Sequence, residues 1–234
     1  MAAFSLIAVL IFGGLCLAPV HCFYMRARKE LLIVLWNILI SPFGIVRFKH
    51  FFLADIITSF VNPLKDIGFM SCFYISGGFL KSDLPTNAKC EGLLSYTLII
   101  AFLPYWFRFA QCLRRYHDTN LKAHLVNAGK YFSSLCIQLA SLLKTLYPSK
   151  MTVNVLIIVS IVSTVYCLGW DYYMDWGLFR SNEKGKKYLR SKILYPFWFY
   201  YYAMISNFIM RFFWILGILT FPTWVSQSQL IILI

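Results

Sequence analysis

A positively charged side chain lies deep within an apolar run near the end of the sequence. Arg211 falls inside residues 197–224, the run that best fits a complete membrane span. A guanidinium near a bilayer centre costs roughly 2.5–3.5 kcal/mol on insertion scales, so we expect it to face protein or water and to have a partner. Asp171 and Asp175 lie in another largely apolar stretch and are candidate partners. The pattern predicts a polar path through a helical bundle, with a cation placed to hold an anion.

The neighbours of Arg211 leave two interpretations open. Asn207, Arg211 and Trp214 share one face of a helical wheel, which forms either one wall of an anion route or a packing arrangement around the guanidinium. Asp171 and Asp175 are four residues apart, so both carboxylates point the same way on an α-helix. These carboxylates either flank a cation or cap the end of a helix.

Further candidates lie where apolar runs begin. Lys130 and Tyr131 stand at the start of the run 131–147 and could present an ammonium and a phenol to an oxyanion, although such a pair also serves as a membrane anchor. Asp55 is a carboxylate at the margin of another apolar region, and its role is ambiguous from the sequence.

The basic stretch 108–130 begins on what we predict to be a helix. Arg108, Gln111, Arg115 and Asp118 share one face of it. We expect most of these charges to meet solvent or lipid headgroups, with a cytoplasmic vestibule as the alternative.

Composition predicts the class of protein that positions these residues. Of 234 residues, 60% are hydrophobic and only 13% are charged, which excludes a soluble domain of this length. We predict an all-α, polytopic transmembrane helical bundle. The formal net charge of +13 is typical of basic cytoplasmic loops, so we do not infer nucleic acid as a partner.

Apolar runs along the chain predict roughly six to eight membrane segments. Residues 2–24 favour a retained first helix over a cleaved signal peptide, because no basic region precedes them. Residues 31–46 are short and lie between two basic clusters, so a tilted, a re-entrant and a lateral helix all remain open. Asn62 and Pro63 predict a break within 51–80. The remaining runs are 92–107, 131–147, 151–170 and 195–224, with polar loops at 81–91 and 180–192.

The sequence carries no motif for covalent catalysis, and the four histidines lack metal-ligand spacing. We therefore expect no enzymatic activity, no metal and no cofactor. The seven cysteines show no paired spacing, so we interpret them as packing residues. Cys90, in the predicted loop 81–91, is the one candidate for a disulfide.

Several of these segments together resemble the EXS-domain family of eukaryotic membrane proteins. The matching segments occur in the family's order: PFGIVRFKHFFLADIITS (42–59), WFRFAQCLRRYHDT (106–119), HLVNAGKY (124–131), WDYYMDWGLF (170–179), LRSKILYP (189–196) and IMRFFW (209–214). That family includes phosphate exporters with an N-terminal SPX domain and shorter Golgi proteins without one, such as the fungal ER-retention-defective protein.

The resemblance implies a domain division and a function. Residues 42–224 are expected to form an EXS-type transmembrane domain incomplete at its C-terminus, preceded by N-terminal membrane segments (1–41) and followed by an atypical tail (225–234). Since the chain starts with a membrane segment, it looks more like the short Golgi type, with the plasma membrane or ER as alternatives. The implied activity is export of inorganic phosphate from the Golgi lumen, in support of glycosylation and of the retention of resident Golgi proteins.

Carried over by matched position, the phosphate route would be lined by a set of charged and aromatic residues. Trp214 is either a gate or a packing residue, and Arg115 is the weaker candidate, at the inner mouth. The implied partners are phosphate, the lipid bilayer and, as an open expectation, a second copy of the chain. The alternative functions are a non-transporting Golgi scaffold or sorting protein and, with less support, a membrane-embedded enzyme. The expected site residues are Asp55, Arg115, Lys130, Tyr131, Asp171, Asp175, Arg211 and Trp214.

Overall fold

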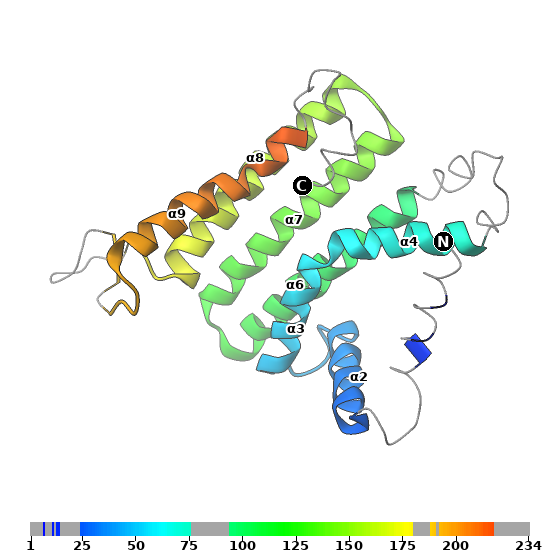
Figure 1. Ribbon diagram of the computed structural model, residues 1–234, viewed down its shortest axis with the longest axis horizontal. Coiled ribbons are helices and arrows are strands. Elements are labelled where there is room, and N and C mark those ends of the chain that lie inside the picture. Colours follow the sequence, from blue (N-terminus) through cyan, green and yellow to red (C-terminus); the bar gives the residue numbers. More distant parts are fainter. Residues whose placement is uncertain are drawn as a thin grey trace. The chain divides into compact units, whose positions relative to one another are not determined.

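The computed structural model describes residues 24–75, 94–179, 188–190 and 192–217, with single positions at 7, 11, 13 and 14. Regular structure within these residues is helical and no strand occurs among them (Figure 1). The all-α prediction is confirmed for this part of the chain. The predicted loop 81–91 and most of the run 2–24 and of the loop 180–192 lie outside the described residues. The chain forms two compact units, Met1–Ile157 and Ile158–Ile234, and each is described by itself.

The described part of the first unit opens with two short helices joined by residues 40–47. Helix α2 covers Met25–Leu39 and helix α3 covers Phe48–Ser59. Val34 and Ile38 of α2 are buried against Ala54 of α3, and this small residue lets the two helices approach closely.

The predicted break in the region 51–80 is confirmed. Helix α3 ends at Ser59 and helix α4, Val61–Ile75, begins two residues later. Pro63 lies in the first turn of α4, where its missing N–H leaves no helical hydrogen bond unmade. The break between α3 and α4 at Phe60 therefore leaves no unpaired backbone N–H at the proline.

A long antiparallel pair of helices forms the centre of the first unit. Helix α6 covers Leu94–Thr119 and helix α7 covers Lys122–Leu146, and the two lie side by side in Figure 1. Asn120 makes the turn between them with a φ of 53°, a conformation that Asn adopts more readily than most residues. The apolar run at 92–107 leads straight into the basic stretch, as the sequence predicts, and α6 continues without interruption to Thr119. The end of the basic stretch lies in the turn and in the first part of α7.

Helix α8, Lys150–Trp170, starts in the first unit and continues into the second. The predicted boundary before it is confirmed at Tyr147–Ser149. There the Thr152 N–H donates to Ser149 Oγ at 3.2 Å, and the Ser149 N–H donates to Thr152 Oγ1 at 3.1 Å. A shallow hollow of about 480 Å³ lies at this turn.

In the second unit, a π-helical turn, η1, extends α8 over Asp171–Asp175. Helix α9 covers Phe197–Arg211 and a 3-10 turn, η2, covers Phe213–Gly217. The prediction of one long helix over the run 195–224 is therefore wrong: α9 ends at Arg211. Arg211 lies at the C-terminal end of the helix and not in its middle.

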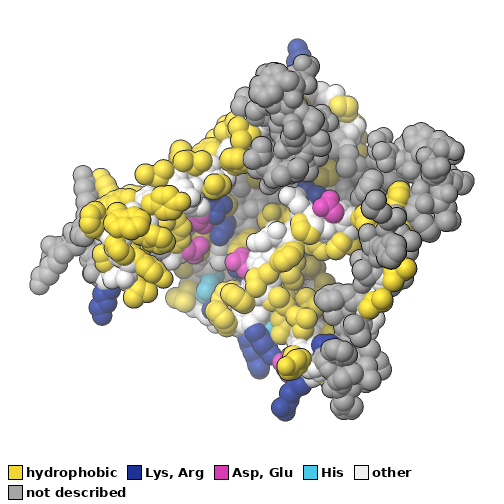
Figure 2. Space-filling model, in the orientation of Figure 1, with side chains coloured by type: hydrophobic (Ala, Val, Ile, Leu, Met, Phe, Trp, Pro, Cys, Tyr) yellow, Lys and Arg dark blue, Asp and Glu magenta, His cyan; other side chains and the backbone are white. Residues whose placement is uncertain are grey.

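One helical stretch in the described residues, Lys150–Asp175, is long and apolar enough to cross a membrane by length and composition. Hydrophobic side chains also cover much of the outer surface of α8 and α9 (Figure 2). The number of membrane segments stays a prediction. Cys72 is disulfide-bonded, which corrects our interpretation of the cysteines as packing residues, whereas Cys112, Cys136 and Cys167 form no disulfide.

Candidate functional site

Three residues of the second unit form a polar group that we call the Asp171 cluster: Asp171, Asn207 and Arg211. Asp171 is the first residue of η1, while Asn207 and Arg211 lie one turn apart on α9. Arg211 Nε donates to Asp171 Oδ2 at 2.8 Å, and Arg211 Nη2 forms an ion pair with the same oxygen. Asn207 Nδ2 also donates to this oxygen, at 3.1 Å. The predicted pairing of Arg211 with an aspartate is therefore confirmed for Asp171.

The guanidinium of Arg211 is only partly occupied by these contacts. Its side chain is 31% exposed, whereas that of Asp171 is 10% exposed. A guanidinium carries five N–H donors, and only Nε and Nη2 bond to Asp171. Within the described part of the second unit, Nη1 has no acceptor. Arg211 is thus held in place by a buried carboxylate while part of its charged edge faces outward.

Asp175 differs from Asp171 in its burial. It is exposed, and its Oδ1 accepts a hydrogen bond from Trp170 Nε1 at 3.0 Å. The expectation that both carboxylates point the same way assumed an α-helix. Residues 171–175 instead form a π-helical turn, in which Trp176 N–H bonds to Asp171 O, five residues back. This wider turn changes the angle between positions 171 and 175, so one carboxylate is buried and the other is exposed.

Trp214 lies beyond the end of α9, in η2, and not on the helical face predicted for it. Its Nε1 donates to Thr164 Oγ1 of α8 at 3.0 Å. The contact joins the segment after Arg211 to the helix that precedes Asp171. Trp214 therefore helps to hold the end of α9 against α8, next to the Asp171 cluster.

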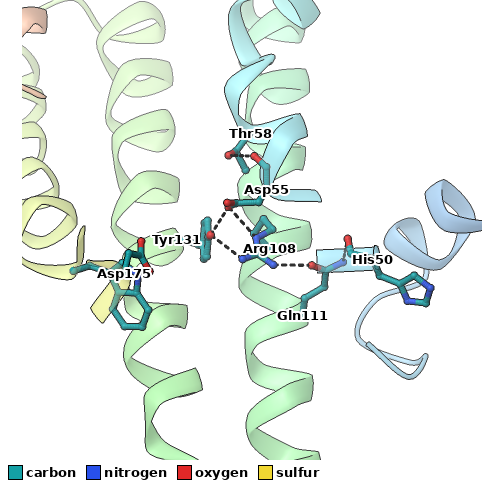
Figure 3. A network of polar contacts seen from close by, with 8 residues as sticks. His50, Asp55, Thr58, Arg108, Gln111, Tyr131 and Asp175 are labelled. Carbon is teal, nitrogen blue, oxygen red and sulfur yellow. Dashed lines mark hydrogen bonds and ion pairs between the residues drawn. The ribbon is translucent and has the colours of Figure 1, made fainter. Parts of the chain in front are cut away.

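A second polar group lies in the first unit, and we call it the Arg108 network (Figure 3). Arg108 Nη2 donates to Tyr131 Oη at 2.9 Å, and Tyr131 donates in turn to Asp55 Oδ1 at 2.6 Å. Arg108 Nη1 donates to Gln111 Oε1 at 3.1 Å, and Gln111 Nε2 lies 3.4 Å from the backbone oxygen of His50. The network joins α3, α6 and α7.

Arg108 is the most buried cation of this network. Its residue is 4% exposed, and Nε lies 3.4 Å from Asp55 Oδ1, close enough for an ion pair but without hydrogen-bond geometry. The guanidinium also lies 4.6 Å from the ring centroid of Tyr131 and 5.4 Å from that of Phe51. These aromatic contacts offset part of the cost of burying the charge.

Two more cations lie beside the Arg108 network. Arg115 lies over the Phe51 ring at 5.1 Å, and the Lys130 ammonium lies over the Tyr131 ring at 5.6 Å. Both act electrostatically on the Cys112 thiol, as do Arg108 and Asp55, so the four charges share one region. Three positive charges against one negative charge leave a net positive field there. Such a field favours a dianion or monoanion over a cation.

The structure thus divides the sequence-predicted site residues between two groups. Asp171 and Arg211 meet directly, Asp55 and Tyr131 meet directly, and Lys130 and Arg115 lie beside the second pair. Asp175 and Trp214 have other partners in the second unit. Sequence reasoning missed Arg108, which we had assigned to a solvated or headgroup-facing helix. The sequence did contain one indication that Arg108 is buried. It shares a helical face with Gln111, and a side-chain amide is a suitable hydrogen-bond partner for a buried guanidinium.

Among the described residues, no group of His, Cys, Asp or Glu could hold a metal ion. The Asp171 cluster and the Arg108 network, each with an arginine paired to a carboxylate, are the candidate chemistry of the described residues, and comparison with known proteins gives them a context. The profile of the EXS family matches residues 1–234. The chain belongs to the EXS family. Proteins of this family are integral to membranes, so the class predicted from composition is confirmed at that level.

Individual relatives of this EXS chain come from distant eukaryotes. It is 34% identical over 226 residues to SPX and EXS domain-containing protein 1 of Dictyostelium discoideum, a match covering 94% of this chain and 24% of the relative. It is 37% identical over 216 residues to human solute carrier family 53 member 1, a match covering 86% of this chain and 31% of the relative. It is 32% identical over 206 residues to the Arabidopsis thaliana phosphate transporter PHO1 homolog 1, a match covering 87% of this chain and 26% of the relative. The EXS chain therefore spans less than a third of the length of these relatives.

Proposed function

We propose that this EXS chain takes part in the transport of inorganic phosphate across a membrane. The Arabidopsis relative is named a phosphate transporter and the human relative a solute carrier. The observation that carries the proposal is the state of Arg211: Asp171, which also accepts from Asn207, holds Nε and Nη2, while Nη1 bonds no acceptor within the described residues of the second unit and can donate to an anion.

Phosphate must exchange much of its hydration for protein contacts when it crosses a membrane. Charge-assisted hydrogen bonds from a guanidinium can replace that hydration. A site made only of cations would hold the ion too tightly to release it, so the carboxylate of Asp171 also has a role. It orients Arg211 and reduces the local positive charge.

The Arg108 network supports the same function in the first unit. Arg115 and Lys130 supply positive charge near Asp55 and Tyr131, and in this proposal they contact phosphate on its route. Asp175 and Trp214 are proposed as route residues by their matched positions alone. In this proposal their observed partners, Trp170 and Thr164, hold them in place.

The finer proposal concerns place and purpose. Among the activities that the EXS resemblance implies, we propose that the chain exports phosphate from the Golgi lumen and so supports glycosylation and the retention of resident proteins. A homodimer is part of this proposal. Localisation of the tagged chain in cells, followed by measurement of luminal phosphate after its depletion, tests it.

Phosphate flux into proteoliposomes tests the proposed activity. We expect Arg211→Ala to lower flux at least about tenfold, because charge-assisted hydrogen bonds contribute about 1.5–3 kcal/mol each. Lys192→Ala is the matched control, since it removes an exposed positive charge from the same unit. Arg211→Lys should recover only part of the flux, because a single ammonium cannot replace the guanidinium fork. Unchanged flux in Arg211→Ala protein of normal folding would contradict transport at this cluster and favour the scaffold function.

A further inference from the structure

Residues 25–49, which we call the hairpin, consist of α2, the connection 40–47 and the start of α3, and they return the chain to the side from which it started. Glu30, near the beginning of α2, forms an ion pair with Lys49, the second residue of α3, at 2.9 Å. Helix α2 has 15 residues, so it is about 22 Å long and shorter than the roughly 30 Å hydrocarbon core. Both observations argue that residues 25–49 enter and leave at one face of the membrane. The re-entrant and lateral alternatives left open by the sequence fit them, and a crossing helix does not.

Helix α2 has two apolar faces with different surroundings. Val34 and Ile38 are buried against α3. Leu32, Trp36 and Leu39 follow helical spacing on the opposite side and are exposed, Trp36 by 62%. Protein covers the first face, and within the described residues the second is open. A Trp in such a stripe is typical of a helix lying at a membrane interface.

Basic side chains surround the polar end of this hairpin. Arg26, Lys29, Arg47 and Lys49 are all exposed, and we call them the basic patch. Arg26 and Lys49 both act electrostatically on Glu30, the single acidic residue within 24–50. The patch therefore carries four positive charges against one negative charge. Figure 2 shows Lys and Arg side chains together at the lower edge of the view, over the region of α2 and α3.

The hairpin lies at the same end of the first unit as the turn between α6 and α7. Arg114 Nη1 is 3.5 Å from the backbone oxygen of Pro42, and Arg115 lies over the Phe51 ring. The turn adds Lys122 to the basic residues at this end. Concentrated Lys and Arg are typical of the cytoplasmic face of a membrane protein.

We propose that α2 lies along the cytoplasmic membrane interface and that the basic patch binds anionic lipid headgroups. The exposed stripe of Leu32, Trp36 and Leu39 enters the acyl boundary, which places the patch at the depth of lipid phosphates. This stripe beside the charges favours a lipid over a soluble polyanion, because a soluble ligand would leave it uncovered. The inference is independent of the proposed phosphate transport, since none of these residues belongs to either polar cluster.

Binding of a fluorescent phosphatidylserine to the purified full chain, in micelles containing phosphatidylcholine, tests the lipid. The variant Arg26→Gln/Lys29→Gln/Arg47→Gln spares the Glu30–Lys49 ion pair. We expect affinity to fall about fivefold for each positive charge removed. The control Lys144→Gln/Lys150→Gln/Lys192→Gln removes the same charge at exposed sites elsewhere and should bind as the unsubstituted chain does. Equal binding by the two triple variants would overturn the proposal. So would displacement of the lipid by inorganic phosphate at constant ionic strength, which would assign the patch to a free anion.

A second measurement tests the position of the hairpin. We expect Arg26→Cys and Lys49→Cys proteins in sealed vesicles to react with a membrane-impermeant maleimide from the same side. Each is compared with the unsubstituted chain, which reports the background from native cysteines. Modification of the two positions from opposite sides would mean that residues 26–49 cross the membrane, and the proposal would fail.

Discussion

Arg108 illustrates how burial, and not residue type, sets the role of a charged side chain. It lies on the same helix as Arg114, six residues away, yet Arg108 is 4% exposed and Arg114 is partly exposed. Arg108 bonds Tyr131 and Gln111 and pairs with Asp55. Arg114 pairs with Asp118, within the same helix. Loss of either arginine removes one positive charge from α6, so the pair forms a natural comparison.

We expect Arg108→Ala to lower the free energy of unfolding by about 2–3 kcal/mol, because it leaves the Tyr131 hydroxyl and the buried Gln111 amide oxygen without the guanidinium donors from which they accept. Arg114→Ala should have a much smaller effect, since exposed ion pairs contribute little. Denaturant unfolding in detergent, followed by circular dichroism, measures both. Equal losses in the two variants would show that the Arg108 network does not stabilise the fold.

The pair of Arg114 and Asp118 predicts a dependence on pH. A hydrogen bond from Arg114 lowers the pKa of Asp118, and His117 adds a smaller effect. A lowered pKa means that the carboxylate stabilises the folded state above its unfolded-state pKa, and that this contribution is lost as pH falls through the folded-state pKa. We expect the difference in unfolding midpoint between the unsubstituted chain and Arg114→Gln to be present at neutral pH and to vanish in acid. A difference that persists in acid would mean that Arg114 acts through packing.

At the scale of elements, the end of α9 depends on two anchors. Arg211 bonds Asp171 of η1, and Trp214 bonds Thr164 of α8. The backbone tightens between them, with Phe212 N–H bonded to Ile209 O and Ile215 N–H to Phe212 O, each three residues back. Both side chains reach the same partner helix because the α-helix gives way to a 3-10 turn after Arg211.

A double-mutant cycle tests the second anchor. We expect Trp214→Phe and Thr164→Val each to lower the free energy of unfolding by about 1 kcal/mol, the usual net contribution of one hydrogen bond. The double variant should lose less than the sum, with an interaction energy of about 1 kcal/mol. Strict additivity would show that Trp214 and Thr164 are not coupled. Flux measured on the same proteins would separate a gate from a packing residue.

At the scale of the whole molecule, helix α7 offers a measure of membrane topology. Its 25 residues span about 37 Å, which exceeds the roughly 30 Å hydrocarbon core. The turn before it carries Arg114, Arg115 and Lys122 close by, so the positive-inside rule assigns that end to the cytoplasm.

We therefore expect Asn120→Cys and Ser149→Cys to react with an impermeant maleimide from opposite sides of sealed vesicles, with position 120 on the cytoplasmic side. Both positions lie in exposed turns, so accessibility does not limit the reaction. Modification of both from one side would mean that α7 does not cross the membrane, and the predicted number of segments would have to be reduced.

The sequence by itself determined the class, the helical boundaries with strong local signals, and the need of Arg211 for a carboxylate partner, with Asp171 and Asp175 as the candidates. Composition, Pro63 and the Tyr147–Ser149 turn act through local chemistry, and a cation in an apolar run requires a partner wherever the chain goes. The family followed from short motifs in order.

Only the tertiary structure decided the rest. Burial of Arg108 depends on Asp55 of α3 and Tyr131 of α7, and the nearer of them, Tyr131, is 23 residues away in the sequence, so no pattern along α6 encodes these neighbours. The divergence of Asp171 and Asp175 depends on a π-helical turn, because a 3.6-residue period aligns positions four apart and a wider turn does not. The early end of α9 is set by partners on α8 and η1. In each case the deciding contact joins segments far apart in the chain.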